Sequence, residues 1–176
     1  KIKRMFDLSE KIALISGASR GIGAAIAQTL SEFGAEVILT SRRIENLKKI
    51  ESQIKNSGKK VSCIACHNGE LEEIESLFEK IHKTHGSLDI LVNNAATNPY
   101  YGPVIDAEEK AWDKTISVNL KGPFFMSQHA ARLIRENGGG AIVNVSSING
   151  KIPMPYQGIY SITKAGLISM TQSFAK

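Results

Sequence analysis

The sequence predicts an α/β fold in which a doubly wound parallel β-sheet carries helices on both faces. Five short apolar runs rich in Val, Ile and Leu alternate with amphipathic stretches along the whole chain. Such runs are typical of strands buried on both faces, and their alternation with helices favours parallel pairing. The 176 residues amount to about 1.2 domains of average size, so we expect a single domain spanning residues 1–176.

The predicted strands and helices follow one another in strict alternation. The strands are expected at 12–15, 37–39, 61–65, 88–92 and 141–145. Apolar residues recur at intervals of three or four between them, which predicts helices over 22–33, 44–54, 71–81, 106–120 and beyond, and 160–175. Asp106 with Glu109 resembles the capping box that begins a helix. We therefore expect the fourth helix to start near Asp106.

Composition and charge exclude several classes of protein. With 42% hydrophobic residues, the chain is neither disordered nor of low complexity. The net charge of +5 comes from lysines that alternate with acids, so we expect a solvated surface and no nucleic-acid partner. No stretch of about 18 apolar residues occurs. Residues 1–4 are not followed by an apolar segment. We expect a cytoplasmic protein that does not bind membranes.

The cysteines and histidines predict neither a disulfide framework nor a metal site. Cys63 and Cys66 have no second pair, so their spacing makes a poor zinc site. In an extended strand they would face opposite sides of the sheet, which favours buried structural thiols over the alternative of a redox pair. His82 and His85 lack a third ligand and are expected at a solvated helix end. We predict no metal.

A glycine-rich turn links the first predicted strand to the first predicted helix. Its glycines allow positive φ angles and a close approach of the backbone, and the helix start offers free N–H groups to a pyrophosphate. The spacing G-x3-G-x-G differs from the generic dinucleotide motif. Its position in an alternating chain nevertheless predicts a nucleotide site. The residues assigned to that site are Gly17, Ser19, Arg20, Gly21, Ile22 and Gly23.

The end of the second predicted strand selects the cofactor. A carboxylate there accepts from the ribose 2′-hydroxyl of NAD, whereas an arginine accommodates the 2′-phosphate of NADP. Here the strand ends in Ser41, Arg42 and Arg43, and Glu36 stands at its wrong end. Arg20 in the glycine loop adds another cation. We therefore expect NADP(H) rather than NAD(H), the alternative being that Arg42 and Arg43 only cap and solvate the next helix.

The last predicted helix carries two side chains suited to acid/base catalysis. Tyr160 and Lys164 are four residues apart and so lie on one face of that helix. A nearby cation stabilises a phenolate, which helps a tyrosine to exchange a proton near neutral pH. Such a pair occurs by chance in many proteins, but here Ser147 precedes it at the end of the fifth predicted strand. The three residues together predict an active site.

In combination these motifs resemble the classical short-chain dehydrogenase/reductase family, over essentially the whole chain. The matching segments are the glycine loop 16–23, Asn93-Asn94-Ala95-Ala96, Asn119 within 117–120, Ser146-Ser147, and 160–164. The resemblance implies a Rossmann fold and an NADPH-dependent oxidoreductase that interconverts a ketone or aldehyde with an alcohol by hydride transfer. Segment 93–102 is similar to that of carbonyl and retinal reductases, which prefer NADPH.

The resemblance also assigns roles to individual residues. It implies that Tyr160 donates and accepts the proton, that Ser147 orients and polarises the carbonyl, and that Asn119 holds a water in a proton relay. Lys164 is implied to assist Tyr160 and to hold the nicotinamide ribose. Further implied cofactor contacts are Ser41, His67, Asn68, Asn94, Ala95, Tyr160 and Lys164.

Two positions depart from the pattern of the family. Ala96 stands where the family usually has a glycine, and His67 stands where it commonly has an aspartate that contacts adenine. Two alternative functions remain beside carbonyl reduction. One is reduction of a 3-oxoacyl group on a carrier protein, and the other is a nucleotide-binding scaffold without turnover. The expected partners are a small carbonyl or alcohol substrate and, in a full-length protein, identical subunits in a homo-dimer or homo-tetramer.

The final predicted helix runs to Lys176 without a Gly or Pro stop signal. A doubly wound sheet of the order 3-2-1-4-5-6 has six strands, one more than this chain supplies. We therefore expect the chain to belong to a longer protein whose C-terminal strands are missing here. The unpaired edge of the fifth strand, around Ile142 and Val143, is then an aggregation risk.

Overall fold

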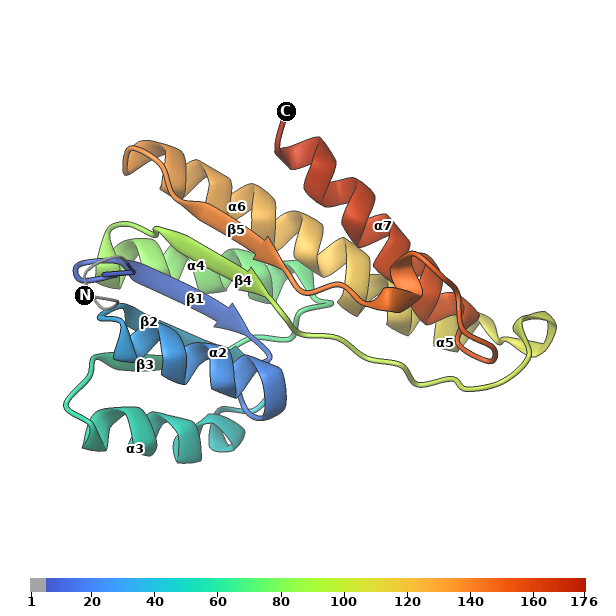
Figure 1. Cartoon of the computed structure of the whole chain (residues 1–176), viewed down its shortest axis with the longest axis horizontal. Helices are drawn as coiled ribbons and strands as arrows, with labels where there is room; N and C mark the ends of the chain where they lie inside the picture. The colour runs from blue at the N-terminus through green and yellow to red at the C-terminus, as the bar shows by residue number, and fades with distance from the viewer. Residues whose placement is uncertain (1–5) are drawn as a thin grey trace.

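A computed structural model of the protein describes residues 6–176, so residues 1–4 and their charges lie outside the described residues. Its centre is a five-stranded, wholly parallel sheet with the order β3-β2-β1-β4-β5 (Figure 1). This arrangement confirms the predicted doubly wound α/β fold. The strands are β1 Ile12–Ser16, β2 Glu36–Ser41, β3 Val61–Ala65, β4 Ile90–Asn93 and β5 Ala141–Asn144.

Within residues 6–176, six α-helices accompany the sheet, joined by shorter helical turns. The α-helices are α2 Gly21–Glu32, α3 Lys48–Asn56, α4 Leu71–His85, α5 Glu109–Ile116, α6 Gly122–Glu136 and α7 Gly158–Phe174. The turns are η1 Ile44–Leu47, η2 Val104–Asp106, the π-helical η3 Ser117–Lys121 and η4 Ile148–Gly150. Every predicted helix is present, with ends shifted by a few residues.

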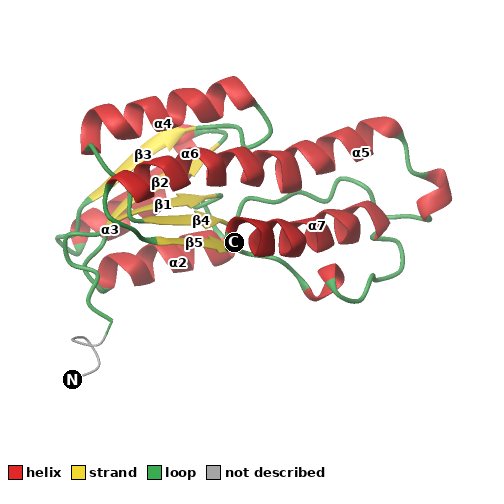
Figure 2. Ribbon diagram, turned by 90° about the horizontal axis from the view of Figure 1, so that it is seen from above, coloured by secondary structure: helices red, strands yellow, loops and turns green. Residues whose placement is uncertain are grey.

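Two hydrophobic cores lie on the two faces of the sheet, because successive side chains of each strand point to opposite sides. Ile15 and Leu39 pack under α2 and α3, whereas Leu14 and Leu91 pack under α4 and α6. Figure 2 shows these helix pairs on either side of the strands. The alternation explains why the strands read as continuous apolar runs: both faces are buried.

The two cysteines follow the same alternation and are not joined by a disulfide. Cys63 packs against the core beneath α2 and α3, and Cys66 belongs to the core beneath α4 and α6. Burial raises the pKa of Cys63 to about 11 and that of Cys66 to about 12. Both thiols therefore stay protonated at neutral pH, as expected of structural thiols and unlike a redox pair.

The predicted start of the fourth helix is wrong. Asp106 ends the separate turn η2, Ala107 is extended, and α5 begins only at Glu109. Glu108 occupies the N-cap position, and no side chain caps the helix, so no capping box forms. From Glu109 the helical path continues through η3 and α6 to Glu136, as the long apolar pattern predicted.

β5 lies at one edge of the sheet and pairs only with β4 among residues 6–176. Within these residues no helix has both the length and the apolar character needed to cross a bilayer. The same part of the chain contains no cluster of three or more His, Cys, Asp or Glu side chains placed to hold a metal ion.

Candidate active site

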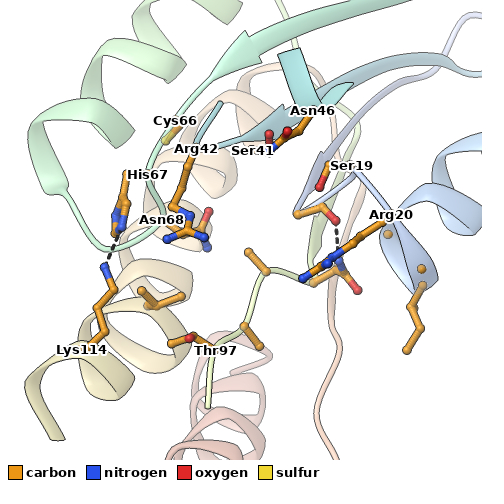
Figure 3. Close-up of a pocket in the computed structure, with 18 residues that line it drawn as sticks. Ser19, Arg20, Ser41, Arg42, Asn46, Cys66, His67, Asn68, Thr97 and Lys114 are labelled. Atoms are coloured by element: carbon orange, nitrogen blue, oxygen red, sulfur yellow. Dashed lines mark hydrogen bonds between the residues drawn. The ribbon is translucent and has the colours of Figure 1, made fainter. Parts of the chain in front are cut away.

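A cleft of about 770 Å³ opens at the carboxyl ends of the strands. β1 lies between β2 and β4. The chain therefore runs from β1 to β2 on one side of β1, and it returns from β3 to β4 on the other side. Such a switch point leaves a crevice where doubly wound sheets bind their ligands. The cleft (Figure 3) is lined by Gly17, Ser19, Arg20, Gly21, Ile22, Gly23, Ser41, Arg42, Asn46, Cys66, His67, Asn68, Asn94, Ala95, Ala96, Thr97, Lys114 and Val118.

The glycine loop forms the floor of the cleft, and two of its glycines have no room for a side chain. Gly17 adopts a φ of +66°, and a Cβ there would lie 2.9 Å from Ala95 Cα. A Cβ on Gly23 would overlap both Asn94 Nδ2 and the Gly17 carbonyl. The loop therefore presses directly against the residues that follow β4. The start of α2 also lines the cleft, and the first N–H groups of a helix suit an anion.

Asn94 ties the glycine loop to the end of β4. Its Nδ2 donates to the carbonyls of Ser16 and Gly17, at 3.0 and 3.2 Å. In return the Ser16 hydroxyl accepts from the backbone N–H groups of Asn94 and Ala95, at 3.0 and 3.1 Å. These four bonds hold the two predicted cofactor segments in one rigid unit, although they are far apart in sequence.

Two cations stand at the end of the cleft beside β2. Arg20 precedes α2 and Arg42 follows β2, and both side chains extend into the cleft (Figure 3). Asn46, which the sequence analysis did not assign, joins them from η1. Arg43 is not among the lining residues. It precedes η1 and its carbonyl accepts from the Ser41 hydroxyl at 2.8 Å.

The acid of β2 is placed where it cannot serve a ribose. Glu36 begins β2, at the opposite end of the strand from the cleft. Its carboxylate lies 3.1 Å from His85 Nδ1 at the end of α4. No carboxylate appears among the residues that line the cleft within 6–176. This end is thus positively charged and lacks the acceptor that an NAD ribose requires.

The end of the cleft beside β3 carries His67 and Asn68. His67 Nε2 lies 2.8 Å from Lys114 Nζ on α5, a residue that no motif in the sequence singled out. Asn68 is 5% exposed, and its Nδ2 atom is buried without a hydrogen-bond partner among the described residues. A buried donor without a partner in the wall of a cleft fits a site that is completed by a ligand.

Tyr160 and Lys164 lie next to each other on α7, as their spacing predicts. Lys164 is 3% exposed, its Nζ donates to the Val145 carbonyl at 2.7 Å, and it lies 5.6 Å from the centroid of the Tyr160 ring. Burial lowers the pKa of Lys164. No carboxylate within residues 6–176 forms an ion pair with this lysine. Its remaining N–H groups are therefore available to other acceptors.

Ser147 is brought toward the same helix by the turn η4. It adopts an extended conformation, and its hydroxyl accepts from the Asn149 N–H at 3.2 Å. The preceding Ser146 hydroxyl donates to the Lys164 carbonyl at 3.0 Å. A Cβ on Gly150 would lie 2.7 Å from the same carbonyl, so η4 packs closely on α7. The segment after β5 and α7 are thus joined at Lys164.

Asn119 lies in the π-helical turn η3 and is buried. Its side chain accepts from the Thr97 N–H at 2.7 Å and donates to the Thr97 carbonyl at 2.8 Å. Its Nδ2 also lies 3.3 Å from Thr163 Oγ1 on α7. Asn119 therefore connects α5 and α6, the loop after β4, and the helix of Tyr160. These three contacts hold the segments together.

The structure therefore divides the predicted residues into two neighbouring groups. The glycine loop, Arg42, His67 and Asn68 line the cleft, whereas Ser147, Tyr160 and Lys164 gather around α7. Several residues line the cleft although the motifs did not assign them to the site: Asn46, Cys66, Ala96, Thr97, Lys114 and Val118. They lie on η1, after β3, after β4, on α5 and in η3, and the packing of these segments brings them together.

Comparison with known proteins decides the family. A family model described as short chain dehydrogenase matches residues 11–176. The chain belongs to the short-chain dehydrogenase family. This confirms the resemblance stated above, and it covers both the glycine loop and the Tyr160–Lys164 pair in a single match.

Individual members of the short-chain dehydrogenase family agree with this chain along most of its length. Dehydrogenase/reductase SDR family member 4 of Sus scrofa is 37% identical over 174 residues, which make up 99% of this chain and 62% of that protein. A putative short-chain alcohol dehydrogenase from Sinorhizobium meliloti superposes with a TM-score of 0.93 at 39% identity, covering 97% of this chain and 67% of that one.

A metagenomic short-chain oxidoreductase in complex with NADP superposes with a TM-score of 0.91 at 37% identity, covering 94% of this chain and 75% of that one. The chain thus spans about 62% of the length of the curated relative described above.

Proposed function

We propose that this protein is the nucleotide-binding and catalytic part of an NADPH-dependent oxidoreductase that interconverts a ketone or aldehyde with an alcohol. The observation that carries the proposal is the environment of Lys164. Its ammonium group is buried against the Tyr160 ring without a carboxylate partner in residues 6–176, next to the turn that presents Ser147. A buried lysine without a counter-ion is costly and is typical of functional sites.

The chemistry requires a hydride and a proton to add across the carbonyl group. When bound, the cofactor supplies the hydride from its nicotinamide ring to the carbonyl carbon and leaves oxidised. Tyr160 donates the proton to the carbonyl oxygen, so that an alcohol forms and atoms and charge balance. Ser147 donates a hydrogen bond to the same oxygen while negative charge develops there. In the direction of alcohol oxidation the same groups act in reverse.

Lys164 serves Tyr160 in this scheme. Its ammonium group favours the phenolate that remains after proton donation. Its position is held by the bond from Nζ to the Val145 carbonyl, and its free N–H groups can hold the nicotinamide ribose. Asn119 holds Thr97 and so shapes the wall between the cleft and α7.

The cleft favours NADPH over NADH. Arg20 and Arg42 supply planar, permanently charged donors that suit phosphate oxygens. The absence of a lining carboxylate within residues 6–176 removes the usual partner of an NAD ribose. The related metagenomic oxidoreductase was solved in complex with NADP, which supports the same preference for this chain.

The test of this proposal is a comparison of the two cofactors with a panel of ketones and aldehydes. We expect NADPH to bind at least about tenfold more tightly than NADH, because loss of the 2′-phosphate leaves charged donors without a partner. Replacing Arg42→Asp should reverse the preference, as measured by the Kd of each cofactor. Equal or tighter binding of NADH by the unaltered protein contradicts the proposal.

The catalytic assignment has its own test in the variant Tyr160→Phe. General acid/base catalysis contributes about 10²–10⁴-fold, so kcat should fall by that factor while the Kd of NADPH stays the same. A variant that retains a tenth of kcat or more shows that the proton comes from another group.

A further inference from the structure

The end of the cleft beside β3 contains more hydrogen-bond donors than acceptors. Lys114 Nζ lies 2.8 Å from His67 Nε2, and the Gly69 N–H donates to His67 Nδ1 at 3.0 Å. A neutral imidazole accepts at one nitrogen and donates at the other, so His67 cannot accept from both neighbours. In either tautomer one donor faces another donor. A protonated imidazole makes the shortage of acceptors worse.

The nearby carboxylates do not relieve this shortage. Glu70 Oε1 is 3.9 Å from His67 Nδ1, which is too long for a hydrogen bond. Glu73 Oε2 accepts from the backbone N–H of His67 at 2.7 Å. Lys114 forms no ion pair with a carboxylate of residues 6–176. The ammonium group of Lys114 is therefore free to bind a ligand that enters the cleft.

Asn68 adds an independent sign that this end is completed by a ligand. It lines the same cleft, is 5% exposed, and its Nδ2 atom has no partner among the described residues. Figure 3 shows His67, Asn68 and Lys114 together on one side of the cleft, opposite the glycine loop. An unpartnered buried donor raises the free energy of the empty site, and a ligand acceptor recovers that cost.

We propose that Lys114 holds the nucleobase of the cofactor by donating a hydrogen bond to one of its ring nitrogens, and that His67 acts as the positioning residue for Lys114. The inference rests on the proposed function, because it assumes a dinucleotide in the cleft. Adenine ring nitrogens accept hydrogen bonds, and only its amino group donates. A donor-rich wall matches such an edge, whereas an aspartate in the place of His67 would accept from the amino group.

The decisive experiment compares Lys114→Met with Lys110→Met by direct titration. Lys110 is exposed, lies one turn earlier on α5 and does not line the cleft, so it controls for loss of a surface charge. We expect Lys114→Met to weaken NADPH, NADH and 5′-AMP by about tenfold each, the effect of one charged hydrogen bond. Nicotinamide mononucleotide lacks the adenine, so Lys114→Met should bind it with the Kd of the unaltered protein. Lys110→Met should bind all four ligands with unchanged Kd.

Each other outcome overturns the inference in a recognisable way. If Lys114→Met weakens NADPH but not NADH, the lysine acts on the 2′-phosphate and not on the base. If it weakens nicotinamide mononucleotide equally, the substitution disturbs the whole cleft. If it changes no Kd, Lys114 does not contact the cofactor. Failure of the unaltered protein to bind either dinucleotide refutes the proposed function instead, so the two failures are distinguishable.

The role of His67 is tested by two substitutions that each keep one of its acceptors. In His67→Gln the side-chain oxygen replaces Nε2, which faces Lys114, and in His67→Asn it replaces Nδ1, which faces Gly69. We expect the Gln variant to retain the affinity for 5′-AMP and the Asn variant to lose about as much as Lys114→Met. If His67→Asn keeps the affinity for 5′-AMP and His67→Gln loses it, His67 only supports the turn at Gly69. Equal losses show that His67 contacts the base itself, and unchanged affinities exclude a role for it.

Discussion

Lys164 shows at the scale of one residue how this fold prepares a charged group for chemistry. The side chain leaves α7 into the interior, where its one hydrogen-bond acceptor among residues 6–176 is the Val145 carbonyl. Desolvation penalises the ammonium form and lowers the pKa of Lys164. The packing of η4 against α7 offsets the free energy that this desolvation costs. In the proposed function, a ribose hydroxyl would meet here a donor that is already oriented and only weakly solvated.

This burial predicts a definite dependence of stability on pH. Because the folded pKa of Lys164 is lowered, the buried ammonium destabilises the fold fully at pH values below that pKa. As the pH rises from there to about 10.4, where an unfolded lysine titrates, the unfolded state holds more protons and the fold gains stability. The free energy of unfolding of the unaltered protein should therefore rise relative to that of Lys164→Met over this range. Urea unfolding at several pH values measures the difference, and parallel curves contradict the prediction.

At the scale of elements, the glycine loop works because three segments share one small volume. The turn after β1, the start of α2 and the segment after β4 meet where Asn94 bonds to the carbonyls of Ser16 and Gly17. Gly23 closes this junction from α2, where a side chain would displace the Asn94 amide. The loop conformation thus depends as much on β4 as on the glycines themselves. The nucleotide site is a property of the junction between elements.

Substitution of Gly23→Ala tests the junction against a matched control. The added methyl group should lower the free energy of unfolding by about 1–3 kcal/mol through overpacking. It should also abolish NADPH binding, because Asn94 must move. Gly58→Ala forces a residue with φ of +73° into strain at an open position after α3, so it should cost about 1–2 kcal/mol and leave the Kd of NADPH unchanged. Calorimetric titration and urea unfolding of both variants separate the two effects. Normal NADPH binding by Gly23→Ala refutes the proposed role of the junction.

At the scale of the whole molecule, the sheet ends in a strand with one free edge. β5 pairs only with β4 within the described residues, and Val143 is 49% exposed. Unpaired N–H and C=O groups beside exposed apolar side chains invite pairing with another chain. The cleft proposed to bind the cofactor lies at the carboxyl ends of β1 to β4, and no residue of β5 lines it. Association through this edge should therefore be separable from cofactor binding.

We expect residues 1–176 to self-associate in solution, and Val143→Lys to reduce that association because charge on an edge strand opposes pairing. Ile152→Lys is the matched control, since Ile152 is also exposed but lies in the loop between η4 and α7. Size-exclusion chromatography with light scattering gives the mass of each variant. An equal effect of both substitutions points to general surface hydrophobicity, and a monomeric unaltered protein contradicts the prediction outright. The Kd of NADPH should be the same in the unaltered protein, Val143→Lys and Ile152→Lys.

The sequence by itself determined the alternation of elements, the glycine loop and the Tyr160–Lys164 pair. These features depend on spacings of two to seven residues, over which strand and helix periodicity fixes which side chains are neighbours. The family match then agrees with that local pattern over residues 11–176. The start of the fourth helix was the local feature predicted wrongly, because η2 and an extended Ala107 displaced the expected cap.

Only the tertiary structure decided which distant residues complete the site. It placed Lys114 beside His67, left Arg43 outside the lining of the cleft, and showed that the Asn119 side chain binds Thr97. Each of these contacts joins residues on different elements, and their meeting depends on how the crossover helices pack against the sheet. A sequence pattern specifies which face of an element is buried, but the partner across the interface is set by the crossing and register of two elements. The contact between Lys114 on α5 and His67 in the segment after β3 is therefore what gives the cleft its donor-rich end.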